Sequence, residues 1–146
     1  MGLSAPFLGQ PVFTVSKTLT FTGAAGLGAV GQVPLFTLTG RVYVRIFVAV
    51  CTVDLVSGGG GSLSLGTPSS LTRQIIATTA TGIDVGEVWA NSTPSIGSRE
   101  LTTNMMNIVF TESPTAEVTV AAITAGTIVF TIEYVPLTAD GALVPV

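Results

Sequence analysis

The side chains of this 146-residue chain that could carry acid–base or nucleophilic chemistry are eight carboxylates and one thiol. There is no histidine, which excludes Ser-His-Asp and Cys-His catalysis as well as imidazole metal sites. Two carboxylates alone can hydrolyse a glycosidic bond, one as acid and one as base or nucleophile. Glu87 has an aromatic platform nearby in Trp89, but the acids are scattered, so we interpret them as isolated, solvated side chains and expect no enzyme activity. The acids are Asp54, Asp84, Glu87, Glu100, Glu112, Glu117, Glu133 and Asp140.

The single thiol and the closest pair of acids do not predict a cofactor or metal site. Cys51 lies among valines and alanine, and no histidine or helix N-terminus is at hand to lower its pKa, so we expect a small buried hydrophobe. Asp84 and Glu87 lack the regular oxygen-rich spacing of a calcium loop. We therefore expect neither a metal nor a cofactor.

Residues 26–31 read Gly-Leu-Gly-Ala-Val-Gly, which matches the G-x-G-x-x-G pattern of dinucleotide-binding proteins. That pattern functions when a helix follows, because the helix N-terminus holds the pyrophosphate. Here residues 32–36, Gln-Val-Pro-Leu-Phe, resemble a strand. We interpret the segment as a loop, and the sequon-like Asn91-Ser92-Thr93 as a polar turn.

The chain is poor in charge, with five Lys and Arg residues, a formal net charge of −3 and 9% charged residues. Globular domains have about 25% charged residues. Without clustered basic side chains, neither nucleic acid nor an anionic membrane surface is an expected partner. The longest uncharged stretch, residues 18–40, is interrupted by glycines and Pro34, so we predict no transmembrane segment.

Alternation of apolar and hydroxyl-bearing residues predicts strands throughout. Phe13, Val15, Leu19 and Phe21 alternate with Thr and Ser, as in a half-buried strand. In the longest run the pattern places Val42 to Val50 on one face at every second residue. We expect an all-β antiparallel two-sheet sandwich of eight to nine strands, jelly-roll-like, with an immunoglobulin-like sandwich as the alternative. The expected strands span residues 13–22, 33–39, 41–55, 63–65, 72–79, 83–90, 105–111, 116–122 and 127–135.

The ends of the chain are apolar and carry the expected contact residues. Residues 1–12 contain two prolines and predict an extended N-terminal arm, which either docks on a partner or packs along its own domain. Residues 13–136 form the sandwich domain and residues 137–146 a C-terminal tail. Trp89 is interpreted as a core residue, with a surface contact as the alternative. The candidate interface residues are Leu3, Phe7, Leu8, Leu143, Val144 and Val146.

Two segments resemble small structural proteins of tailed-bacteriophage virions. They are residues 17–42, with Lys-Thr-Leu-Thr-Phe-Thr-Gly at their start and Gln-Val-Pro-Leu-Phe-Thr-Leu-Thr-Gly-Arg-Val at their end, and residues 128–141. The resemblance lies in strands rich in Thr, Val and Gly, few charges and a short apolar tail. It is nearest to head decoration (cement) proteins, which implies a symmetric oligomer, often a trimer, on the capsid and no catalytic residues.

The sequence therefore predicts a virion structural protein that binds the major capsid protein and self-associates, a trimer being favoured. It would be made in the host cytoplasm and lie on the capsid surface. The alternative is a tail or fibre module that binds a host glycan through Trp89, Tyr43 or Tyr134, since exposed aromatics serve such sites.

Overall fold

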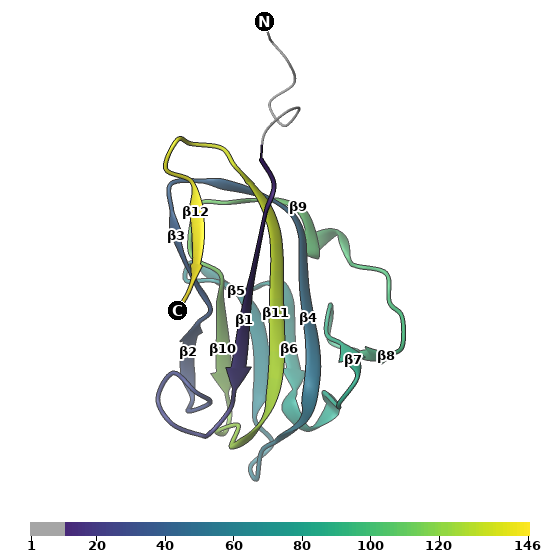
Figure 1. The fold of residues 1–146 in the computed structure, drawn as a ribbon. Coiled ribbons are helices and arrows are strands. Elements are labelled where there is room, and N and C mark those ends of the chain that lie inside the picture. Colours follow the sequence, from purple (N-terminus) through teal and green to yellow (C-terminus); the bar gives the residue numbers. More distant parts are fainter. Residues whose placement is uncertain (1–10) are drawn as a thin grey trace, which may run out of the picture.

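A computed structural model describes residues 11–146 of the chain (Figure 1). Its first strand, β1 (Phe13–Thr20), runs antiparallel to β11 (Ala125–Pro136), with Leu19 opposite Ile128. Because side chains of a strand alternate between the two faces, Val15 and Leu19 of β1 face the interior, while the Thr and Ser residues of β1 face outward. The alternation in the sequence thus produces a strand pair with one buried face.

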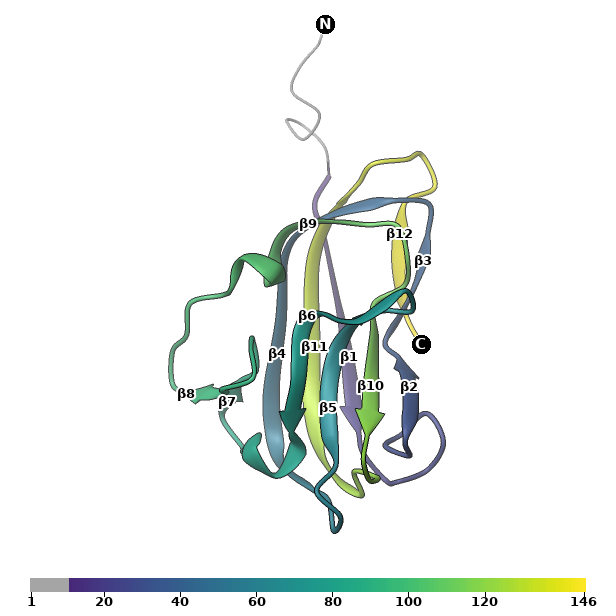
Figure 2. The ribbon, with the colours of Figure 1, turned by 180° about the vertical axis from the view of Figure 1, so that it is seen from behind.

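Two antiparallel sheets pack face to face, as expected for a β-sandwich. The front sheet has the order β1-β11-β4-β7-β8, with β9 also paired to β4, and the back sheet has the order β2-β10-β5-β6 (Figures 1 and 2). A separate pair, β3 with β12, lies above β2. The remaining bounds are β2 (Gly31–Pro34), β3 (Phe36–Thr39), β4 (Val42–Val56), β5 (Ser62–Thr67), β6 (Ser70–Thr79), β7 (Glu87–Val88), β8 (Ser95–Ile96), β9 (Met106–Phe110), β10 (Thr115–Thr119) and β12 (Ala142–Pro145).

Aromatic side chains fill the space between the sheets. Phe47 packs against Phe110 and Phe130 with ring centroids 6.2 and 6.3 Å apart, and Trp89 meets Phe130 edge to face. Trp89 is fully buried, and its Nε1 donates a hydrogen bond of 3.0 Å to Thr78 Oγ1 on β6. Trp89 is therefore a core residue, as the sequence indicated, and its polar atom is paired inside the core.

The alternation expected along β4 is wrong beyond Arg45, because a β-bulge lies there. Val44 is opposite Tyr134 and Ile46 is opposite Glu133, so two residues of β4 advance for one of β11. An extra residue reverses which side chains face inward. Val42 and Val44 are buried as expected, but beyond the bulge the buried residues are Phe47, Ala49 and Cys51, not Ile46, Val48 and Val50.

Two further expectations change with the structure. Residues 83–90 do not form one strand, since Gly86 takes a φ of +86° in a turn and Glu87–Val88 alone pair. Residues 137–146, expected as a tail, contribute β12 and so belong to the folded domain. The described residues hold twelve strands rather than eight to nine, because the predicted strand 33–39 is divided into β2 and β3, and the short strands β8 and β12 add to those predicted. The helical segments are single 3-10 turns, η1 (Ala80–Gly82) and η2 (Thr103–Met105).

We predict that Thr78→Val destabilises the protein by about 1–3 kcal/mol, because the buried indole N–H of Trp89 loses its acceptor. Thr79→Val is the matched control: Thr79 is the next residue of β6 and is exposed, so its loss should cost little. The measurement is urea unfolding followed by Trp89 fluorescence. Equal stability of the two variants would contradict the role of this hydrogen bond.

Candidate functional site

The outward-facing side of the front sheet, here called the outer face, has an apolar centre flanked by polar residues. Its centre consists of Ile46, Val48 and Val50 on β4 and Val129 and Thr131 on β11, all partly exposed. The register places Val50 beside Val129 and Val48 beside Thr131, so the side chains form adjoining rows. No described element lies in front of β1, β11 and β4 (Figure 1). Contiguous apolar patches of this kind mark contact sites for partners.

The β1 side of the outer face is polar but uncharged. Thr14, Ser16, Thr18 and Thr20 face outward in a row, and Ser16 Oγ lies 3.0 Å from Thr131 Oγ1. Thr20 Oγ1 likewise lies 3.4 Å from Thr127 Oγ1 of β11. A surface of short, uncharged hydroxyl side chains can approach another surface without burying a charge.

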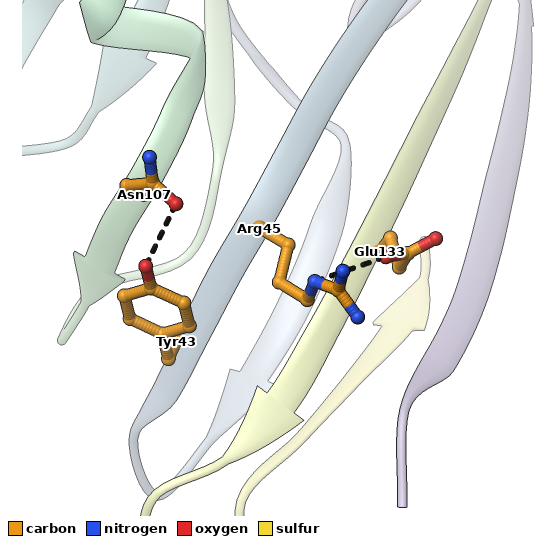
Figure 3. A network of polar contacts seen from close by, with 4 residues as sticks. All are labelled: Tyr43, Arg45, Asn107 and Glu133. Atoms are coloured by element: carbon orange, nitrogen blue, oxygen red, sulfur yellow. Dashed lines mark hydrogen bonds and ion pairs between the residues drawn. The ribbon is translucent and has the colours of Figure 1, made fainter. Parts of the chain in front are cut away.

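A polar cluster occupies the upper part of the outer face at the β4 bulge (Figure 3). Arg45 Nε and Glu133 Oε1 are 3.3 Å apart, and the Tyr43 hydroxyl donates a hydrogen bond of 2.7 Å to Asn107 Oδ1. Asn107 has a φ of 55°, a left-handed conformation that asparagine tolerates better than most residues. The exposed ion pair adds about 0–1 kcal/mol of stability, but it neutralises the charges of this part of the face.

Three loops at one end of the sandwich, residues 21–30, 57–61 and 120–124, contain no charged residue and are here called the uncharged end. The segment that begins at η1 lies beside them, because Ala80 N donates a hydrogen bond of 2.9 Å to the Gly61 oxygen, and this segment carries Asp84. The loops touch: Ile123 N donates a hydrogen bond of 2.8 Å to the Gly28 oxygen, and a Cβ on Gly59 would meet Ala121. Val120 at the tip of its loop has a φ of 72° and is 76% exposed. A β-branched residue in this conformation is strained, and such strain concentrates at functional sites.

A polar groove of about 390 Å³, here called the edge groove, runs along β9 and across to β6. The sequence pattern does not reveal this groove, because its lining residues come from three separate segments of the chain. Glu112 lies at the groove and accepts hydrogen bonds from the backbone N–H and the hydroxyl of Ser69. These bonds lower the pKa of Glu112, so it carries its charge at neutral pH. The other lining residues include Thr67, Arg73, Gln74, Asn104, Asn107 and Thr111.

The predicted interface residues are divided by the structure. Leu3, Phe7 and Leu8 lie outside the described residues. Leu143 is 4% exposed and packs in the core, because alternation on β12 turns it inward while Val144 points out. Val144 and Val146 are exposed at one edge of the sandwich, where Lys17 Nζ donates to the Val146 oxygen.

The other candidates take structural positions. The glycine-rich segment at residues 26–31 is a loop between β1 and β2, with positive φ at Gly26 and Gly28. Glu87 Oε2 accepts a hydrogen bond of 2.8 Å from the backbone of Asp84. Within residues 11–146, no group of three potential ligands is arranged to hold a metal ion, and no helix has the length and hydropathy to span a membrane.

Cys51 is buried on β4, and its Sγ lies 3.1 Å from the Val53 oxygen. Burial raises the pKa of this thiol to about 11, because the thiolate would lose its hydration. The nearby carboxylates of Asp54, Asp84 and Glu87 raise it further.

Comparisons with known proteins identify no relative: no family model, no curated protein and no solved structure matches this chain.

The bulge leads to a direct test of the outer face. We predict that Val48→Lys remains folded and costs at most about 1 kcal/mol, because Val48 points outward beyond Arg45. Ala49→Lys, the next residue of the same strand, points into the core and should unfold the protein, since it buries an unpaired charge. Circular dichroism and thermal unfolding measure both. Unfolding of Val48→Lys with a stable Ala49→Lys would mean that the bulge is absent.

The native Cys51 thiol should resist alkylation by iodoacetamide at pH 8, because that pH lies well below its raised pKa and the thiolate is the reactive form. Unfolding returns the pKa to its ordinary value and should make the thiol react promptly. Mass spectrometry with and without urea measures the difference. Rapid labelling of the folded protein would contradict its burial.

Proposed function

We propose that the protein is a non-enzymatic virion structural protein, a capsid decoration protein that binds the head surface and self-associates. The observation that carries the proposal is the outer face, where Ile46, Val48, Val50 and Val129 are partly exposed together on one sheet. Burying apolar area of this kind stabilises association by roughly 25 cal/mol per Å². Function through contact area requires rigidity rather than reactive groups.

The outer face suits the contact with the shell formed by the major capsid protein. The charged residues of the outer face, Arg45 and Glu133, already pair with each other. Docking it would therefore not leave an unpaired charge buried. Many copies on one lattice would make even a modest interface effective.

The uncharged end suits contacts between copies of the chain. Identical copies carry the same net charge of −3 and repel each other, so neighbours meet best where charge is lacking. Leu27, Val30 and Val120 are exposed there. A closed ring of such contacts, a trimer in our proposal, would present the outer faces in one direction.

We further propose that the sandwich is a jelly roll. The pairs β1 with β11, β2 with β10, β4 with β9 and β5 with β6 support this, because they are the pairs of one long hairpin rolled into two sheets. Jelly rolls occur in viral capsid and lectin domains. This is a likeness of fold, and it supports the virion proposal only as an analogy.

The experiment compares binding to shells assembled from the major capsid protein. We expect the wild-type protein to co-sediment with the shells and to form an oligomer in light scattering. Val48→Lys should lose shell binding, because a charge would be buried at the contact. Ile76→Lys is the matched control, an exposed apolar residue on β6 of the back sheet, and should bind normally.

A monodisperse monomer that also fails to bind shells would refute the proposal. If Val48→Lys binds shells as well as the wild type and Ile76→Lys binds them less well, the contact lies on the back sheet instead.

A further inference from the structure

The edge groove has the size and lining of a site for a small polar ligand. Its volume of about 390 Å³ lies within the range of roughly 300–1,000 Å³ for small-molecule sites. It lies on the edge of the sandwich between the two sheets, away from the apolar centre of the outer face, and meets the outer face at Asn107.

Gln74 supplies the first feature that points to a ligand. This β6 residue lines the groove and is 6% exposed, yet its Oε1 accepts no hydrogen bond from any described residue. A buried amide oxygen without a donor is costly. Rotation of the terminal amide would offer either its oxygen or its nitrogen to a group in the groove.

Asn107 supplies a second amide with a fixed orientation. Its Oδ1 is occupied by the Tyr43 hydroxyl, and Figure 3 shows Nδ2 pointing away from Tyr43. Nδ2 forms no hydrogen bond with the described residues, so it remains a donor at a residue that lines the groove. The hydrogen bond from the Tyr43 hydroxyl to Oδ1 holds this amide in place.

The charge of the groove is balanced. Arg73 contributes one positive charge, and Glu112, whose carboxylate is held by Ser69, contributes one negative charge. An anionic ligand would be repelled by Glu112, and a cationic ligand would be repelled by Arg73. Amides, hydroxyls and one charge of each sign suit a neutral ligand whose groups both donate and accept hydrogen bonds.

We propose that the edge groove binds a neutral saccharide. The hydroxyls of a sugar ring donate to Gln74 Oε1, accept from Asn107 Nδ2 and accept from the Arg73 guanidinium. Sugar hydroxyls both donate and accept, which matches this mixture of partners. A peptide with alternating charges is the competing occupant, and the test below distinguishes it.

The test is an NMR titration of the 15N-labelled protein with glucose, galactose, mannose and N-acetylglucosamine, after a glycan array has ranked longer neutral oligosaccharides. We expect at least one neutral sugar to shift the side-chain amide signals of Gln74 and Asn107. Glucuronate and a mixed-charge peptide serve as comparison ligands.

Two variants and one control locate the site. Gln74→Leu removes the amide at similar size, and Asn107→Gly removes the amide while permitting the φ of 55°. Each should weaken sugar binding by about tenfold, the loss expected for one or two hydrogen bonds. Gln32→Leu, an exposed glutamine on β2 of the back sheet, should leave the affinity unchanged.

The proposal is overturned if no neutral sugar shifts the two amide signals, or if both variants bind the sugar as tightly as wild type. It is also overturned if glucuronate or the peptide alone shifts them, since the ligand class would then be different.

Discussion

The arrangement of this protein depends on the extra residue at Arg45 in the pairing of β4 with β11. These are the two longest strands, and their side chains form the middle of both the core and the outer face. One inserted residue reverses the direction of every side chain beyond it. It turns Phe47 toward Phe130, which in turn packs against Trp89. The same step exposes Ile46, Val48 and Val50, so core packing and contact surface arise from one bulge.

Two polar side-chain interactions bear on the contacts that this protein can make, one at the edge strand β1 and one between the outer face and the edge groove. Lys17 occupies an inward position of the edge strand β1 and reaches the Val146 oxygen, and an inward-pointing lysine hinders pairing of edges with other chains. Tyr43 and Asn107 join the outer face to the edge groove, because the tyrosine fixes the amide that lines the groove. The two proposed binding surfaces thus share β9 as a boundary and meet at Asn107.

Prediction from sequence succeeded where alternation persists and failed where one residue changes the backbone. The strands around Phe13 and Ile128 follow the period of two, so their faces could be read directly. The turn at Gly86 and the bulge at Arg45 leave no mark in the alternation of the sequence. Both depend on how the strand pairs with its neighbour. The position of Leu143 was hard to predict for the same reason. An apolar residue near a chain end lies in the core or on the surface depending on the strand with which its segment pairs, which here is β3.

The sequence by itself determined the all-β class, the burial of Trp89 and Cys51, and the scarcity of charge that suits a contact surface. These follow from residue types and from a local period, which need no knowledge of distant partners. The tertiary structure decided which valines of β4 face outward, and it assembled the uncharged end from three loops. It also brought Gln74 and Asn107, 33 positions apart, to one groove. Strand register and loop proximity are long-range properties, and they arise when the sheets pair and pack.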